Sequence, residues 1–263
     1  MMRAMGTAAS GMKAMQMQID TISNNLANVN TTGFKKSSMQ FQDLLYETVV
    51  PGGQVRSDGM AAPSRVEVGH GVKMVSTSKD FGQGTVISTN NPLDLMIEGD
   101  GFFQVQLPDG DFAYTRDGSF KMDGERNIVT SMGYRLEPNL QVPVDATEIA
   151  IARDGTVSVR LAGDSANVQE IGRIELVRFP NAAGLVARGS NLFLESPASG
   201  TPLTGNPGED GIGELGSGFL EMSNVETVDE LVRMITAQRA YELNSKTITM
   251  ADQMLQTANG IKR

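Results

Sequence analysis

The first 30 residues place apolar side chains in two series with seven-residue spacing, offset from each other by three positions. The large members of these series are Met5, Met12, Met15, Ile19, Ile22 and Leu26. A seven-residue apolar period marks the a and d positions of a heptad repeat, so the segment predicts a long helix with one apolar seam. Asn28 and Gly33 follow, and residues of these types commonly end a helix.

The C-terminal segment repeats the seven-residue period. Its large members are Met234, Tyr241, Ile248 and Leu255. Ser223 and Glu226 have the spacing of a capping box, and Thr227 and Glu230 repeat it one turn later, so two starts are compatible with the sequence. Asn259 with Gly260 provides an end, and with the earlier start the helix would span residues 223–259. At the usual rise per residue, such a helix would be about 55 Å long.

Two arrangements of these helices are compatible with the pattern. Each helix could lie on an ordinary globular core, which is the common role of a single amphipathic helix. Because the seven-residue period occurs at both ends and only there, the sequence favours a coiled-coil-like domain formed by the two termini. One stripe on each helix buries too little apolar surface to offset the ordering of the backbone. We therefore expect both ends to fold fully only when several copies pack together.

In the middle of the chain the apolar period changes to two, as in Phe103, Val105 and Leu107. This alternation predicts strands with one buried face. Asp-Gly pairs, which favour hairpin turns, separate the runs at 109–110, 117–118, 123–124 and 154–155. Residues 51–64 and 196–218 are rich in Gly, Pro and Ser, which predicts linkers or extended arms. The predicted fold class is α+β, with an antiparallel β domain inserted between two long terminal helices.

Composition and charge exclude several classes of protein. The chain of 263 residues has 22 Lys and Arg against 31 Asp and Glu, a formal charge of −9 that argues against a nucleic-acid-binding face. Cysteine is absent, which excludes disulfides, thiolate nucleophiles and cysteine-ligated metals. No apolar run is long enough to predict membrane insertion, and no segment resembles a cleavable signal peptide.

Candidate chemical sites are few. Residues 211–216 match the pattern G-x-G-x-x-G but lack the flanking strand and helix of a dinucleotide site, so we interpret them as a linker. The acidic residues over 109–125 lack the spacing of a calcium loop and fit turns. His70, the single histidine, lies between two glycines, which favours a loop position over a catalytic base. We therefore expect no catalytic residue, no metal, no cofactor and no enzymatic activity.

Four motifs, spread over the whole chain, resemble those of the bacterial flagellar rod and hook proteins. They lie at residues 23–35, 97–103, 114–120 and 223–246. The positions that match the terminal signatures of that family are Asn24, Asn25, Leu26, Ala27, Asn28, Gly33, Phe34, Gln238, Arg239, Tyr241 and Asn244. Within the family, the chain length and residues 43–48 and 68–72 are most similar to the members that form the distal rod.

The resemblance implies a structural subunit that self-assembles into a rigid helical tube and transmits torque from the motor to the hook. Its location would be the distal rod of the flagellar basal body, where the rod crosses the periplasm toward the outer membrane. The implied partners are many copies of the same chain, the proximal rod and hook proteins, the outer ring proteins that form the bushing, and the flagellar export apparatus. Neither nucleic acid nor membrane insertion is implied.

The same reasoning divides the chain into three parts. Residues 1–32 and 223–263 would form the helical assembly domain, and residues 96–204 the outer β domain. Residues 33–95 and 205–222 would connect them, with an extended bracing arm at about 46–63 that the resemblance implies. The predicted contacts between subunits are the large heptad residues of both helices: Met5, Met12, Met15, Ile19, Ile22, Leu26, Met234, Tyr241, Ile248 and Leu255.

Two other functions remain open at this point. The chain could be another axial flagellar protein, such as a proximal rod or hook subunit. It could also be a secreted ligand-binding β domain whose helices only oligomerise it. The last alternative predicts a closed oligomer and a ligand cleft, whereas an axial subunit predicts open-ended tubes.

Overall fold

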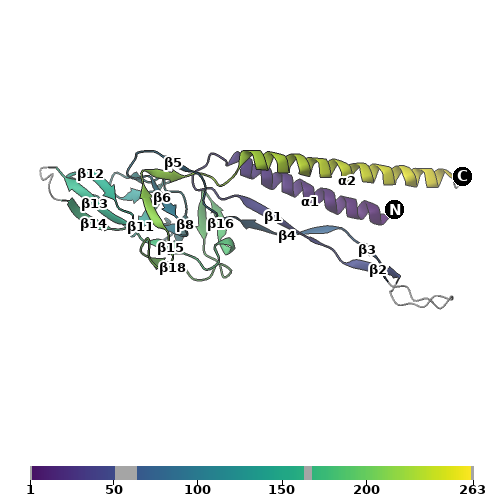
Figure 1. Ribbon diagram of the computed structural model, residues 1–263, viewed down its shortest axis with the longest axis horizontal. Coiled ribbons are helices and arrows are strands. Elements are labelled where there is room, and N and C mark those ends of the chain that lie inside the picture. The colour runs from purple at the N-terminus through teal and green to yellow at the C-terminus, as the bar shows by residue number, and fades with distance from the viewer. Residues whose placement is uncertain (1, 51–63, 163–167, 262–263) are drawn as a thin grey trace. The chain divides into compact units, whose positions relative to one another are not determined.

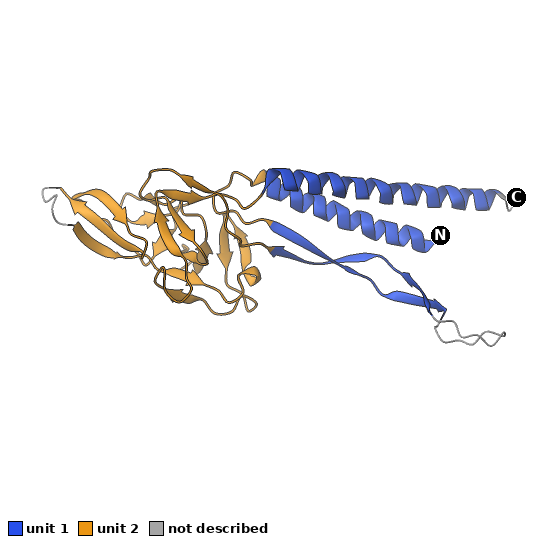
Figure 2. Ribbon diagram, in the orientation of Figure 1, with its two compact units in different colours: residues 1–26, 37–78, 226–263 blue, residues 27–36, 79–225 orange. Residues whose placement is uncertain are grey.

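The computed structural model describes residues 2–50, 64–162 and 168–261. The chain separates into two compact units (Figure 2). Unit 1 contains residues 1–26, 37–78 and 226–263, and unit 2 contains residues 27–36 and 79–225. The three-part division predicted from the sequence stays a prediction.

Unit 1 contains both long helices, α1 (Met2–Ala27) and α2 (Thr227–Ile261), as Figure 1 shows. The predicted end of the first helix near Asn28 is confirmed. The Ser223 Oγ accepts a bond from the Val225 N–H at 3.3 Å in the turn before the second helix. Of the two starts predicted for that helix, the structure has the later one, at Thr227. Its first turn carries Asp229 and Glu230, whose negative charge suits a helix N-terminus.

An extended two-stranded ribbon completes unit 1. Strand β1 (Ser37–Asp43) pairs with β4 (Val72–Lys79), and β2 (Tyr46–Val50) pairs antiparallel with β3 (Val66–Gly69). The predicted arm at 46–63 therefore begins as strand β2, and the rest of it, residues 51–63, lies outside the described residues.

Unit 2 is built mainly from antiparallel strands. Its nine-stranded sheet has the order β16–β17–β8–β7–β11–β10–β9, with β15 beside β7 and β18 beside β15. These strands are β16 (Val186–Gly189), β17 (Leu192–Leu194), β8 (Phe112–Thr115), β7 (Phe102–Gln106), β11 (Arg135–Glu137), β10 (Ile128–Val129), β9 (Lys121–Met122), β15 (Leu176–Arg178) and β18 (Leu203–Gly205).

The remaining strands of unit 2 form smaller sheets. A three-stranded sheet contains β12 (Ala146–Ile151), β13 (Thr156–Leu161) and β14 (Val168–Arg173). Two pairs join distant parts of the chain: β6 (Leu95–Glu98) with β19 (Glu214–Ser217), and β5 (Val86–Ser88) with β20 (Phe219–Glu221). A short 3-10 helix spans Ala182–Gly184.

A continuous apolar core explains why unit 2 holds together. Alternate residues of the sheet strands point inward, as the period of two predicts, and Phe103 is fully buried with its ring edge-on to Phe120 at a centroid distance of 5.0 Å. A second cluster of aromatic rings joins Phe102, Phe179 and Phe193 through edge-to-face contacts.

The turn predictions divide into confirmed and wrong ones. Asp-Gly pairs at 109–110, 123–124 and 154–155 do connect paired strands, including the β12–β13 hairpin. The pair at 117–118 is not a hairpin turn, because β8 pairs with β7 and β17 rather than with the strand that follows it. The linker predicted over 196–218 is also wrong, since β18 and β19 lie within it and pair with β15 and β6.

The α+β fold class is confirmed, with a helix at each end and a largely antiparallel β middle. The coiled-coil-like pairing of the termini stays a prediction, as does the coupling of their folding to assembly. No helix in the described part of the chain is long and apolar enough to cross a membrane.

Candidate assembly surface

Helices α1 and α2 meet through small and polar side chains. Gly11 faces Asn244 so closely that a Cβ at position 11 would lie 3.1 Å from the Asn244 Oδ1 and Nδ2 atoms. Further along, the Asn25 Nδ2 donates to the Glu230 Oε2 at 3.3 Å. Because residue 11 meets 244 and residue 25 meets 230, the two helices run antiparallel at these contacts.

Asn25, one of the family-motif positions, connects three elements of unit 1. Its Oδ1 accepts from the Ser37 N–H at 2.9 Å, and its Nδ2 donates to the Ser37 carbonyl at 2.9 Å. The bond to Glu230 adds α2 to α1 and β1. Both Asn25 and Glu230 are buried, so each bond satisfies a polar group that water does not reach.

Helix α2 has two faces of different character. The buried face follows a seven-residue spacing and consists of small or polar residues: Glu230, Ala237, Asn244 and Ala251, of which Asn244 is half-buried. A separate set of large apolar side chains is exposed in the single chain. We call this set the outer stripe; it consists of Val228, Val232, Ile235, Leu243, Met250 and Met254. At 3.6 residues per turn, the outer stripe lies about 140° around the helix from the buried face.

Six of the ten predicted contact residues lie on α1, and the four on α2 lie beside its buried face, on the side away from the outer stripe. Ile22 is buried within the chain's own fold, and Tyr241 is exposed. The half-buried ones are Met5, Met12, Met15, Ile19, Leu26, Met234, Ile248 and Leu255. The sequence analysis missed the outer stripe because its two seven-residue pairs, Val228–Ile235 and Leu243–Met250, are out of register with each other.

The end of the family motif at 23–35 lies in unit 2, which includes residues 27–36. Gly33 has φ +65°, and a Cβ there would lie 2.5 Å from the Asp117 backbone nitrogen, so only glycine fits. Phe34 is buried beneath the Lys79 ammonium, which lies 5.1 Å from the ring centroid. The motifs at 23–35 and 114–120 are thus in direct backbone contact at Gly33.

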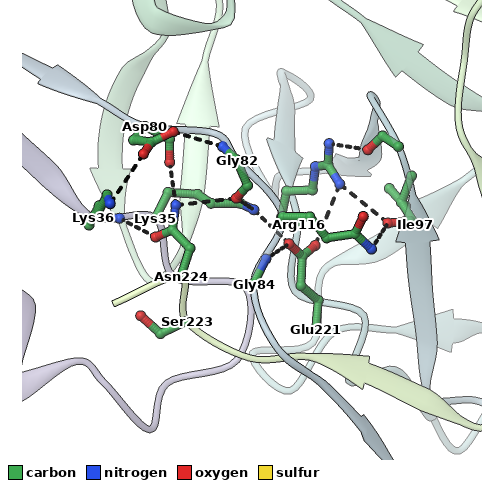
Figure 3. Close-up of polar contacts among 12 residues, drawn as sticks. Lys35, Lys36, Asp80, Gly82, Gly84, Ile97, Arg116, Glu221, Ser223 and Asn224 are labelled. Atoms are coloured by element: carbon green, nitrogen blue, oxygen red, sulfur yellow. Dashed lines mark hydrogen bonds and ion pairs between the residues drawn. The ribbon is translucent and has the colours of Figure 1, made fainter. Parts of the chain in front are cut away.

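A buried cluster of charges lies beside this contact (Figure 3). The Lys35 Nζ donates to the Glu221 Oε1 at 2.6 Å and to the Gly82 carbonyl at 2.8 Å. The Arg116 guanidinium lies 3.5 Å from the Glu221 Oε2 and donates to the Gly99 carbonyl at 2.7 Å. The exposed fractions of the Lys35, Glu221 and Arg116 side chains are 0%, 1% and 2%.

Burial lowers the pKa of both cations in this cluster, Lys35 and Arg116. Desolvation lowers the pKa of the Lys35 ammonium, and the adjacent Glu221 carboxylate opposes that shift. Desolvation likewise lowers the pKa of Arg116, again opposed by Glu221. The Arg116 Nε is buried with no hydrogen-bond partner among the described residues. Sequence reasoning missed this cluster because Lys35 and Glu221 are 186 positions apart.

The other family-motif residues are less involved in the fold. Gln238 and Arg239 are exposed on α2, and Asn24 and Ala27 are exposed near the end of α1. Asn28 accepts a bond from the Thr31 hydroxyl at 3.2 Å in the turn that follows α1. These positions are compatible with contacts outside the chain rather than with packing inside it.

The alternative chemical sites receive little support. Strand β19 begins within the glycine-rich segment at 211–216, and the next regular element is another strand rather than a helix. His70 is partly exposed, with its Nε2 3.6 Å from a Glu47 carboxylate oxygen. The described residues contain no group of three or more His, Cys, Asp or Glu side chains placed to hold a metal ion.

These features define a class of protein: a chain whose two ends form a helical unit with an uncovered apolar stripe, and whose middle forms a self-contained β unit. Comparison with known families agrees with that class. Residues 5–35 match the family described as flagella basal body rod protein, residues 96–159 the flagellar hook protein FlgE/F/G D1 domain, and residues 217–261 the flagellar basal body rod FlgEFG protein C-terminal.

Similar proteins cover the full length of the chain. The flagellar basal-body rod protein FlgG of Borreliella burgdorferi is 52% identical over 100% of both chains. The FlgG proteins of Caulobacter vibrioides and Bacillus subtilis are 48% and 41% identical, over 99% and 100% of this chain and 100% of each relative. The chain therefore belongs to the flagellar basal-body rod protein family, which confirms the resemblance and the basal-body location predicted from its motifs.

Proposed function

We propose that this chain is the structural subunit of the distal rod, which self-assembles head to tail into a rigid helical tube and transmits torque from the motor to the hook. The observation that carries this proposal is the outer stripe of α2, six large apolar side chains that the chain's own fold leaves exposed. Membership of the rod family and the similarity to FlgG proteins support it.

The outer stripe supplies a driving force for assembly. Each of its six side chains is already partly covered, so full burial contributes roughly 1 kcal/mol apiece, or about 6 kcal/mol per helix. A contact that joins two different faces of the same chain and does not close on itself generates a helical filament. Copies of this chain are therefore the occupants that we assign to the stripe.

The remaining predicted partners follow from the same proposal. The tube would contact the proximal rod and the hook at its two ends and the outer ring proteins around it, and the export apparatus would deliver its subunits. The half-buried heptad residues beside the buried face, such as Met234, Ile248 and Leu255, lie on the opposite side of α2 from the outer stripe, so they would form a second, separate contact with neighbouring copies. The role is structural, and no catalytic step is assigned to it.

A charge in the stripe tests the proposal. Leu243→Asp places a carboxylate at a position with 64% exposure, so the single subunit should fold normally. In the tube the same carboxylate would be buried without a partner, and assembly should fail. Met132→Asp, at a similarly exposed apolar position in unit 2, is the matched control and should assemble.

Electron microscopy of the purified proteins and swimming in soft agar measure the outcome. Normal tubes from the Leu243→Asp protein would contradict the proposal. A closed oligomer from the unmodified protein would instead favour the secreted ligand-binding alternative. The position of the protein along isolated basal bodies distinguishes the distal rod from the proximal rod and the hook.

A further inference from the structure

The chain passes between its two units four times, at residues 26/27, 36/37, 78/79 and 225/226. Three of these passages begin or end within a few residues of the buried charge cluster. Lys35 and Lys36 precede the second passage, Asp80 follows the third, and Asn224 precedes the fourth. All the contacts that follow lie within unit 2.

The three segments are bonded to one another in a closed ring (Figure 3). The Lys36 N–H donates to the Asn224 Oδ1 at 2.8 Å, and the Asn224 Nδ2 donates to the Asp80 carbonyl at 2.8 Å. The Asp80 N–H closes the ring by donating to the Lys36 carbonyl at 3.0 Å. Each segment is thus hydrogen-bonded to the other two.

The buried charges join the same segments a second time. Lys35 comes from the first segment, its acceptor Gly82 from the second, and its acceptor Glu221 from the third. Glu221 also accepts from the Gly84 N–H at 2.9 Å, and Arg116 connects that carboxylate to the residues that follow β8.

Such a cluster is a costly way to stabilise a core. Apolar residues of similar volume commonly stabilise a fold as well as a buried ion pair does, whereas charged groups accept only a few geometries. Two cations that share one carboxylate, with the Arg116 Nε left unpaired, make the arrangement costlier still. What the charged cluster provides, and an apolar filling would not, is a fixed geometry.

We infer that Lys35, Arg116, Glu221 and Asn224 are positioning residues that hold the three connecting segments at one fixed spacing where they leave the β unit. The ring also sets the stiffness of the assembled tube, a consequence that rests on the proposed function. Within one copy, these three segments and the passage at 26/27 are the covalent connections between the two units, so load carried along the backbone passes through them.

Removing one side chain of the ring tests the inference in the single subunit. Asn224→Ala should accelerate hydrogen exchange at the Lys36 and Asp80 amides at least tenfold, because both donate within the ring. Asn181→Ala is the matched control, since its Nδ2 also donates to a backbone carbonyl at 2.8 Å but lies away from the passages. Unchanged exchange at both amides in Asn224→Ala would overturn the inference.

A second variant separates geometry from stability. Lys35→Met, Arg116→Met and Glu221→Leu together remove all three charges and keep an apolar filling, so unit 2 should unfold at a temperature close to that of the unmodified protein. Its Lys36 and Asp80 amides should nevertheless exchange at least tenfold faster, and its tubes should have a persistence length at least twofold shorter. Unchanged exchange in this variant would also overturn the inference.

The two proposals can fail separately. If the unmodified protein forms no tubes, the proposed function fails, while the exchange rates still decide the positioning role. If tubes form and the Asn224→Ala and triple variants are as stiff as the Asn181→Ala control, the link between the ring and stiffness is wrong.

Discussion

The two units of this chain differ in where they place their large apolar side chains. Unit 2 places its large side chains in one continuous core, where Phe103, Val105 and Leu136 have no exposed surface. Unit 1 buries mainly small residues between its helices and leaves large ones, such as Leu243 and Met250, outside. The difference shows that unit 2 contains its own apolar core, whereas unit 1 has large side chains that its own fold leaves uncovered.

Polar groups divide along the same boundary. Unit 2 contains a buried ion cluster between Lys35, Arg116 and Glu221, which fixes its own segments. Unit 1 relies on the Asn25 side chain, whose bonds to Ser37 and Glu230 connect one strand and two helices. The Ser10 Oγ also accepts from the Val72 N–H at 3.3 Å, which joins α1 to β4. A helical unit held by a few polar bonds and small-residue contacts can adjust to neighbours more readily than a packed sheet can.

The largest effect on stability is expected in the core of unit 2. Phe103→Ala removes a fully buried ring that contacts Phe120, so the free energy of unfolding of unit 2 should fall by about 3–5 kcal/mol. Phe112→Ala, at a largely exposed position on the neighbouring strand, should change it by less than about 1 kcal/mol. Urea denaturation followed by the β signal in circular dichroism measures both, and equal effects would contradict the assigned core.

A smaller loss is expected at the polar centre of unit 1. Asn25→Ala leaves the Ser37 backbone groups and Glu230 without their partner, so the helices should lose about 1–3 kcal/mol. Helical circular dichroism during denaturation should report the change, while the β signal of unit 2 stays as before. Gln16→Ala, an exposed position on the same helix, is the control and should have little effect.

A substitution at the contact between Gly11 and Asn244 should change the stability of the helices still less, by an amount that depends on the residue at position 244. Gly11→Ala gains about 1 kcal/mol of helix propensity, but its Cβ would crowd Asn244 at 3.1 Å, so the net change should be near zero. With Asn244→Ala in place the crowding disappears, and Gly11→Ala should stabilise the helices by about 1 kcal/mol. A double-mutant cycle with no coupling between the two positions would show that the helices do not meet there.

The smallest effect concerns acid stability at the start of the second segment of unit 2. The Gly82 N–H holds the pKa of the Asp80 carboxyl below its usual range, with Lys36 adding to the shift. A depressed pKa means that the carboxylate stabilises the fold at neutral pH and loses this contribution as pH falls through the folded-state pKa. Asp80→Asn should therefore cost a few tenths of a kcal/mol near pH 7. The difference in the free energy of unfolding between Asp80→Asn and the unmodified protein should vanish below the folded-state pKa of Asp80. Denaturation series at pH 7 and at a pH below that pKa measure it.

Much of the fold could be predicted because it depends on local patterns. The end of α1, the β12–β13 hairpin and the alternation in β7 all follow from neighbouring residues. The choice between the two possible starts of α2 could not be made, because the spacing of Ser223 and Glu226 also fits the turn that Ser223 forms with Val225.

The candidate sites were harder to predict because they depend on distant residues or on a competing period. A seven-residue template selects Met234 and Ile248, but the exposed Ile235 and Leu243 are eight positions apart and therefore fall outside any single seven-residue series. Lys35 is indistinguishable from a solvated lysine until the fold brings Glu221 to it.

Because the chain contains no cysteine, a single introduced thiol can report directly on the outer stripe. In dispersed subunits, Leu243→Cys should react with a maleimide as fast as Val144→Cys, an exposed position in unit 2. After assembly into tubes, the thiol at position 243 should react at least tenfold more slowly, whereas the thiol at 144 should keep its rate. Equal reactivity at position 243 before and after assembly would contradict the claim that neighbouring copies cover this stripe.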